Sequence, residues 1–81
     1  MELKDTIKMM DNADYKERFK AEYYQTKIRY DKLVAMCDKW DKDELDFTPT
    51  CPRTIFYMQL DAMKTYLNIL QFRAQLENIK L

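Results

Sequence analysis

The chain has 81 residues, with 14 basic and 14 acidic side chains and no histidine, glycine or serine. Zero net charge argues against a general nucleic-acid binder, because such proteins rely on many contacts to phosphate. Without histidine or serine, a Ser-His or Cys-His catalytic pair is excluded. The absence of glycine disfavours the tight turns of β-hairpins, so the composition favours an all-α protein. A chain this short also buries little surface, and oligomerisation is the expected additional source of stability.

The cysteines and acidic residues favour a protein without catalytic or metal chemistry. Cys37 and Cys51 lie far apart in the sequence and have no histidine to join them, so we expect no metal and no cofactor. The acidic residues between positions 41 and 46 are interleaved with lysine, which is typical of a solvated connector. The opening residues lack the apolar segment of a signal peptide, and no run is long enough to span a membrane. We therefore expect a cytosolic protein that is not an enzyme and whose two thiols are free.

A short helix is expected at about residues 2–10, where Leu3, Ile7 and Met10 share one helical face. A helix of two or three turns is marginal alone. We therefore expect it to dock on the rest of the chain or on a neighbouring subunit.

The first long helix is expected at about residues 14–39. Asp14 is a suitable N-cap, and Glu17 follows three residues later, as in a capping box. Apolar and aromatic positions then alternate by four and three, which is the 3.5-residue period of coiled-coil packing. These positions are Phe19, Tyr23, Thr26, Tyr30, Leu33, Cys37 and Trp40.

Residues 40–52 are expected to form a loop, because two prolines interrupt the helical pattern there. Pro52 suits the first turn of the next helix, with Thr50 or Cys51 as its cap. The aromatic side chains expected to fold back over the open end of the hairpin are Trp40 and Phe47.

The second long helix, at about residues 53–79, is apolar on two faces. We name as the first seam the positions Leu60, Met63, Leu67, Leu70 and Ala74. The second seam, on an adjacent face, consists of Ile55, Met58, Ala62, Tyr66, Ile69 and Leu76. One seam suffices for a helical hairpin, so the second one indicates packing against something outside the fold. The sequence thus predicts a single domain over residues 1–81: an antiparallel two-helix hairpin with a short N-terminal helix, assembling into a homo-oligomer.

Aromatic and basic side chains at the start of the first long helix are candidates for ligand binding. Tyr15 and Arg18 lie one turn apart, so both can reach one ligand. An aromatic ring can stack on a nucleobase, and an arginine can hold phosphate oxygens. For Tyr23 and Tyr30, which fall on the packing seam, we favour packing. For Tyr15, which lies outside that seam, both interpretations stay open.

On the second long helix, Lys64 and Arg73 interrupt apolar surface. Arg73 falls on the second seam between Ile69 and Leu76. An arginine there pairs with a carboxylate across an interface, extends to water or holds an anion. Asp61 lies three residues before Lys64 and is placed to neutralise it locally.

Two segments of the chain resemble a known family. Its first pattern consists of a tyrosine, an arginine three residues on, an apolar residue, a glutamate, a basic residue and a leucine. Here these places are occupied by Tyr15, Arg18, Phe19, Glu22, Arg29 and Leu33. The family's closing segment is similar to Ala62-Met63-Lys64, Tyr66, Ile69-Leu70 and Arg73. The family is the small helical-hairpin proteins of bacteriophages, which include the anti-CBASS cyclic-nucleotide sponges and the hairpin part of anti-Thoeris sponges.

The resemblance implies a homo-oligomer, commonly a hexamer, in the cytoplasm of a bacterial host. Such a protein binds cyclic di- or trinucleotide signals of the host's immune cyclases without cleaving them. By the resemblance, Tyr15 would stack on a base, and Arg29 stands at the family's basic position with Arg18 on the same helix. Arg73 and Lys64 would line a separate pocket between subunits. The partners implied are the cyclic nucleotide and further copies of the chain, with no DNA and no membrane.

A rival interpretation is an oligomeric hairpin of a phage that has a structural or protein-interaction role and no nucleotide ligand. It predicts that Tyr15→Ala and Arg29→Ala leave function intact, whereas Leu67→Asp or Ile69→Asp abolishes it. A third possibility, a cyclic-nucleotide hydrolase, would return linear product, but the residues for that reaction are missing.

Overall fold

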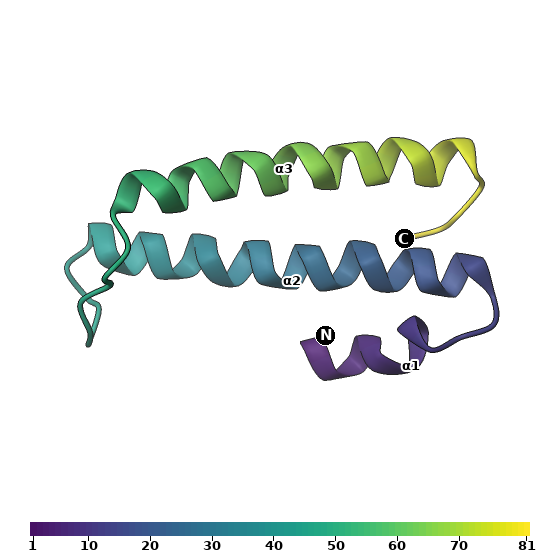
Figure 1. Ribbon diagram of the computed structural model, residues 1–81, viewed down its shortest axis with the longest axis horizontal. Coiled ribbons are helices and arrows are strands. Elements are labelled where there is room, and N and C mark those ends of the chain that lie inside the picture. Colours follow the sequence, from purple (N-terminus) through teal and green to yellow (C-terminus); the bar gives the residue numbers. More distant parts are fainter.

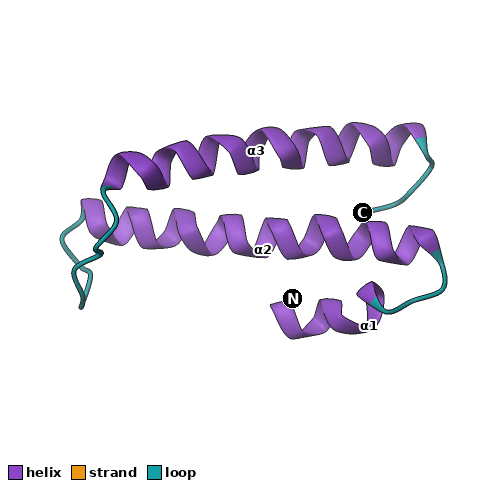
Figure 2. Cartoon of the chain, in the orientation of Figure 1, coloured by secondary structure: helices purple, strands orange, loops and turns teal.

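The fold is all-α, as expected: a short N-terminal helical segment and two long helices that pack along each other, with no strand. A computed structural model describes all residues, 1–81. A 3-10 turn, η1 (Leu3–Thr6), leads into α1 (Ile7–Met10), and the long helices are α2 (Tyr15–Asp41) and α3 (Arg53–Leu76). The long helices run antiparallel, and the N-terminal segment lies along α2 on the side away from α3 (Figure 1). The connecting loops lie at the two ends of the molecule (Figure 2).

The first seam of α3 forms the centre of the hairpin core. Its members Leu67, Leu70 and Ala74 are buried, and they pack with Phe19 and Tyr23 of α2. Ile79, from the segment after α3, completes this cluster. The core is therefore concentrated toward the end of the hairpin where α2 begins and α3 ends.

The second seam of α3 is exposed in the single chain. Ile69 and Leu76 are 50% and 84% exposed. Phe72, which the sequence pattern did not include, is 67% exposed and lies three residues after Ile69 and four before Leu76. A large apolar surface on one face of a helix therefore has no partner within the chain.

The N-terminal segment packs through other residues than expected. Ile7 and Met10 are exposed, whereas Thr6 is fully buried and its hydroxyl donates to the carbonyl of Leu3. The reason is the 3-10 turn, which has three residues per turn instead of 3.6. Leu3, Thr6 and Met9 consequently share the face that lies against α2.

The loop end is covered by Trp40 but not by Phe47. The Trp40 ring meets Phe56 of α3 edge-on, with ring centroids 6.0 Å apart. Phe47 stays exposed, contrary to the expectation. The residue that caps α3 is Pro52 rather than Thr50 or Cys51; its extended backbone (φ −61°, ψ 146°) leads into the helix without a side-chain hydrogen bond.

The far end of α3 lies at Leu76, three residues earlier than expected. The cause is Asn78, whose φ of 56° is left-handed and turns the chain out of the helix. Asparagine tolerates this conformation, which ends many helices. The turn is closed by a hydrogen bond of 2.8 Å from the amide of Ile79 to the carbonyl of Ala74. Neither long helix has a stretch apolar enough, over sufficient length, to cross a lipid bilayer.

Candidate ligand-binding site

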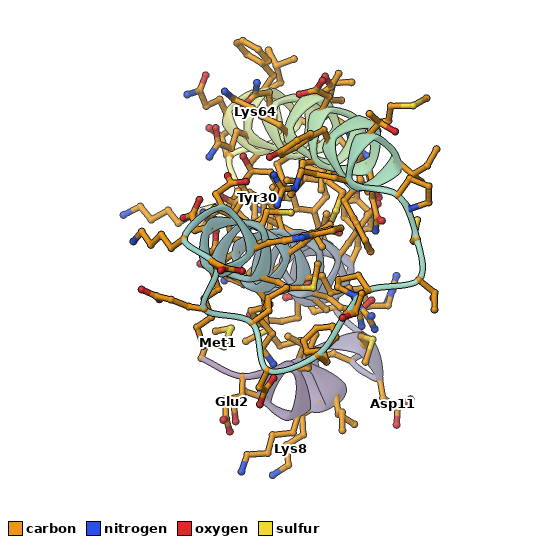
Figure 3. All side chains as sticks on the ribbon, turned by 90° about the vertical axis from the view of Figure 1, so that its left-hand side faces the viewer. Met1, Glu2, Lys8, Asp11, Tyr30 and Lys64 are labelled. Atoms are coloured by element: carbon orange, nitrogen blue, oxygen red, sulfur yellow. The ribbon has the colours of Figure 1, made fainter.

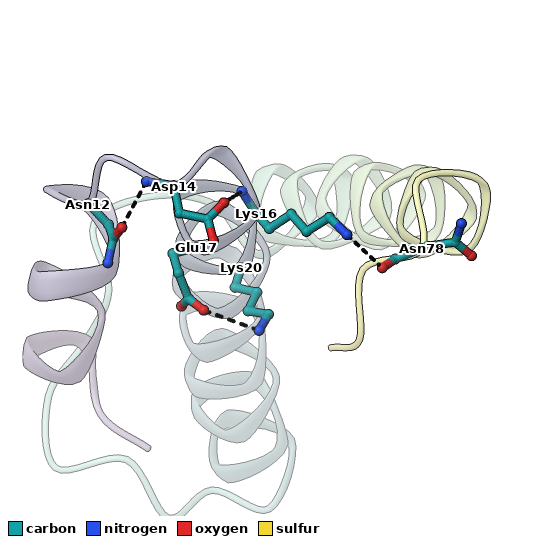
Figure 4. A network of polar contacts seen from close by, with 6 residues as sticks. All are labelled: Asn12, Asp14, Lys16, Glu17, Lys20 and Asn78. Carbon is teal, nitrogen blue, oxygen red and sulfur yellow. Dashed lines mark hydrogen bonds and ion pairs between the residues drawn. The ribbon is translucent and has the colours of Figure 1, made fainter.

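The candidate site is at the end of the hairpin where α2 begins. Asp14 caps α2 by accepting a hydrogen bond of 2.9 Å from the amide of Lys16, as expected of an N-cap. The reciprocal half of a capping box is absent, because the Asp14 amide donates to Asn12 and Glu17 pairs with Lys20 (Figure 4). This cap fixes Tyr15 as the first residue of α2, with its side chain 46% exposed.

Tyr15 meets Arg73 across the hairpin, although 58 residues separate them. Nη2 of Arg73 donates to the Tyr15 hydroxyl over 2.9 Å. The Arg73 guanidinium also lies 4.9 Å from the centroid of the Phe19 ring, which fixes it by a cation–π contact. Arg73 was expected on the second seam; instead it faces α2, and Phe72 occupies the outer position. An exposed aromatic ring and a guanidinium are thereby held side by side.

Glu77 is the third member of this group, and the sequence analysis missed it. Its Oε1 accepts a hydrogen bond of 2.8 Å from the Tyr15 hydroxyl, and its Oε2 accepts one of 3.3 Å from Nε of Arg73. The spacing of four residues from Arg73 was a usable signal, since such pairs face each other on a helix. It was overlooked because Arg73 was assigned to another face.

The charges of Arg73 and Glu77 affect the ionisation of the Tyr15 phenol. The hydrogen bond to the Glu77 carboxylate, more than partial desolvation, raises the pKa of the Tyr15 phenol, although Arg73 acts in the opposite direction. Tyr15 therefore remains a neutral hydroxyl at physiological pH, able to donate to one neighbour and accept from another.

Arg18 does not join Tyr15 at the site. Its Nη1 donates to the carbonyls of Asn12 and Ala13 over 2.7 and 2.8 Å, in the connection between α1 and α2. Arg18 forms no ion pair with a carboxylate. In the single chain, these two bonds hold the connection that precedes the N-cap.

Arg29 lies in a different part of the molecule. It is exposed and makes no ion pair, and it lines a shallow groove of about 430 Å³ between the N-terminal segment, α2 and α3. Lys32 is the other cation of this groove, and Leu33, Phe56 and Met63 are among its apolar residues. The groove therefore combines positive charge with apolar surface.

Lys64 occupies a third position. It lines a small hollow of about 150 Å³ between α2 and α3 together with Lys27, Tyr23 and Tyr30. Figure 3 labels Tyr30 and Lys64 on the two facing helices. Lys64 forms no ion pair with Asp61, contrary to the expectation, whereas Lys27 is paired with Asp31 at 2.8 Å.

The five predicted site residues are therefore distributed over separate positions, of which only Tyr15 and Arg73 are in contact. Fourteen residues separate Tyr15 from Arg29, which corresponds to about 21 Å along a helix. Nine residues separate Lys64 from Arg73, or about 14 Å. One chain thus offers several incomplete sites rather than one closed pocket.

No group of three or more cysteine, aspartate and glutamate side chains is arranged to hold a metal ion. Both cysteines are free, as expected, with Cys37 buried and Cys51 half-buried.

Comparison with known proteins places the chain in a family. A family model described as Sequestin matches residues 13–76, which include both long helices and the loop between them. No curated protein and no solved structure matches the chain.

Proposed function

Because this chain belongs to the Sequestin family, whose name denotes sequestration rather than catalysis, we propose that it captures cyclic oligonucleotide signals and holds them intact. The ligands proposed are the cyclic di- or trinucleotides with which bacteria activate CBASS-type immunity, and the source proposed is a bacteriophage. Free signal falls by mass action, and the host effector stays inactive. This mechanism requires tight binding and many copies of the protein, but no turnover.

The observation that carries the proposal is the pairing of Tyr15 with Arg73. A nucleotide presents a flat base and an anionic phosphate, and Tyr15 offers an exposed ring whose hydroxyl oxygen lies 2.9 Å from Nη2 of Arg73. Base stacking on aromatic rings contributes about 1–3 kcal/mol per base. Arginine recognises phosphate through directed, charge-assisted hydrogen bonds.

Completing the pockets requires further copies of the chain. Tyr15 and Arg29 of one chain are about 21 Å apart along α2, too far to hold one phosphate together. In a symmetric assembly, one copy contributes Tyr15 and its neighbour contributes Arg29, so the site is complete only between subunits. Lys64 is proposed to line a second pocket between subunits, whereas Arg73, which was expected beside it, belongs to the first site because it contacts Tyr15. A homohexamer is the assembly proposed, by the resemblance noted above.

The surface proposed for assembly is the second seam with Phe72. Its exposed members Ile55, Met58 and Ile69 continue along most of α3. Burying such a surface is the main driving force for association between protein chains. The apolar face thus supplies the stability that a chain with nine buried residues lacks.

Calorimetry with a panel of cyclic di- and trinucleotides tests the ligand. We expect at least one to bind with sub-micromolar affinity and to be recovered uncleaved. Tyr15→Ala should abolish most of the binding, and Tyr57→Ala is the matched control, since Tyr57 is another exposed tyrosine (41% against 46%) at the opposite end. Absence of binding by every member of the panel would refute the proposal.

Light scattering tests the assembly. Ile69→Asp places a carboxylate on the second seam and should dissociate the oligomer, whereas Asn68→Asp introduces the same charge one residue away, off the seam. Leu67→Asp is unsuitable, because Leu67 is buried in the core of the hairpin. A wild-type protein that is monomeric in dilute solution would contradict the assembly.

The second seam also supports one rival function, a structural or protein-interaction role without a nucleotide. In that case Ile69→Asp removes function, and neither Tyr15→Ala nor Arg29→Ala has an effect. The two functions are therefore separated by the same set of variants.

A further inference from the structure

Glu77 already occupies the groups that would bind a phosphate. Both of its carboxylate oxygens are used, one by the Tyr15 hydroxyl at 2.8 Å and the other by Nε of Arg73 at 3.3 Å. Arg73 closes the ring by donating to Tyr15 at 2.9 Å. Carboxylate and phosphate oxygens compete for the same guanidinium geometry. Glu77 and Tyr15 thus occupy the Nε–Nη2 edge of Arg73, and a phosphate that binds this edge beside Tyr15 must displace Glu77.

The main chain around Glu77 is held without its side chain. The amide of Glu77 bonds to the carbonyl of Arg73 at 2.9 Å, and Ile79 is buried in the core. Lys16 donates through Nζ to the carbonyl of Asn78 at 3.3 Å (Figure 4). The Glu77 side chain is therefore free to rotate away while the turn stays in place.

The position of Glu77 also makes its carboxylate easy to displace. Glu77 is the C-cap of α3, and a negative charge there is opposed by the helix dipole. Only Arg73 and Tyr15 offset that repulsion, and the ion pair with Arg73 is partly exposed. Glu77 is also the first residue after the segment that matches the family model, so its carboxylate lies outside the part of the chain that the family model covers.

We propose that Glu77 is an internal competitor that makes the Tyr15–Arg73 site selective for nucleotides over simple phosphates. This inference rests on the proposed function and adds a specificity-determining residue to it. A phosphodiester carries one negative charge, as the carboxylate does, so exchanging one for the other yields little electrostatic energy. The favourable binding free energy of a nucleotide therefore comes from the base that stacks on Tyr15. Inorganic phosphate has no base and loses the competition with Glu77.

The test is a titration of the protein with inorganic phosphate, followed by NMR at the Nε–H of Arg73. In the wild type we expect weak binding. Glu77→Gln keeps the size of the side chain and removes its charge, so phosphate should bind about 2- to 5-fold more tightly, the range given by a partly exposed ion pair. Asp41→Asn is the matched control: it frees Arg53 at the other end of the hairpin and should leave the Arg73 response unchanged.

A second measurement does not depend on a variant. In the wild type carrying a bound cyclic nucleotide, the ¹³C resonance of the Glu77 carboxyl should shift as the carboxylate leaves Arg73. Phosphate affinity that is unchanged or weaker in a folded Glu77→Gln protein would overturn the inference, and so would a Glu77 carboxyl that stays in place while Arg73 responds. Either result leaves the proposed function standing, since that function fails only if no cyclic nucleotide binds the wild type.

Discussion

The two ends of the hairpin are built from the same four kinds of group. At the loop end, Nη1 of Arg53 lies 2.9 Å from Oδ1 of Asp41, and its guanidinium is 4.5 Å from the centroid of the Trp40 ring. The hydroxyl of Tyr57 donates to the same carboxylate over 3.4 Å. At the other end, Arg73, Glu77, Phe19 and Tyr15 repeat this combination of arginine, carboxylate, ring and phenol.

The ends differ in the location of the carboxylate. Asp41 is the last residue of α2 and Arg53 the first of α3, so their ion pair ties the two helices together. Glu77 instead lies four residues after Arg73 at the end of α3, so their ion pair is local, and Glu77 reaches α2 only through the hydrogen bond from Tyr15. Releasing Asp41 would remove the ion pair between the helices. Releasing Glu77 would remove one hydrogen bond to Tyr15, and the bond from Arg73 to Tyr15 would still join α3 to α2. Similar groups therefore form a clamp at one end of the hairpin and, as we propose, an exchangeable site at the other.

The largest expected effect is a difference in cyclic-nucleotide affinity between variants of the two arginines, Arg73 and Arg53. Arg73→Ala should weaken cyclic-nucleotide binding about 10- to 100-fold, because it removes charge-assisted hydrogen bonds to phosphate. Arg53→Ala should leave the Kd within about 2-fold. Calorimetry on both variants measures this, and equal losses would show that the two ends do not differ in function.

A smaller expected effect is a difference in folding stability between variants of the two carboxylates, Asp41 and Glu77. Asp41→Asn removes the ion pair between the helices and should lower the free energy of unfolding by about 0.5–1 kcal/mol. For a chain of this length that is a fall in Tm of about 2–8 °C. Glu77→Gln should change Tm less, because the helix dipole already opposes the Glu77 charge. Thermal melts followed by circular dichroism compare the two, and a greater loss in Glu77→Gln would contradict the assignment of the clamp.

The two tyrosines should titrate differently for different reasons. Both have a pKa raised above the ordinary value of 10.0, Tyr15 chiefly by its hydrogen bond to Glu77 and Tyr57 chiefly by desolvation, with Asp41 adding to it. Glu77→Gln should therefore return the pKa of Tyr15 toward its ordinary value, while Asp41→Asn should leave part of the rise at Tyr57. Titration followed by ¹³C NMR of the tyrosine rings measures both pKa values.

The sign of the associated stability follows from the raised pKa values. The protonated phenols stabilise the folded chain fully below pH 10, and this contribution is lost as the pH rises through the folded-state pKa. A Tyr15 pKa that does not respond to Glu77→Gln would contradict the hydrogen bond between them.

The smallest expected effect concerns the thiols of the loop end. Burial raises the pKa of the Cys37 thiol, whereas Cys51 is half-buried at the start of α3. An aromatic disulfide reagent at neutral pH should therefore modify Cys51 first and Cys37 only as the chain unfolds. Cys51→Ala should abolish the fast phase of the reaction, and a fast phase that survives in this variant would show that the loop end opens readily.

The sequence by itself determined the two long helices and the apolar faces of α3, but not the face by which the N-terminal segment packs. The spacing of Leu67, Leu70 and Ala74 predicted the buried side of α3, and the spacing of Ile55, Met58 and Ile69 predicted the exposed one. These are local properties, because a helix repeats every 3.6 residues wherever it lies. The same kind of pattern made Tyr15 a candidate, since it begins a helix and lies outside its seam.

Only the tertiary structure decided which side chains meet. The contact of Arg73 with Tyr15 depends on the register and rotation of two helices, and no local period contains that information. The carboxylate of Glu77 likewise meets the Tyr15 hydroxyl only because the end of α3 lies beside the start of α2. Arg18 is diverted to the carbonyls of the preceding connection. A sequence fixes the face of each helix through short-range periodicity, whereas a site is made by the long-range packing that brings those faces together.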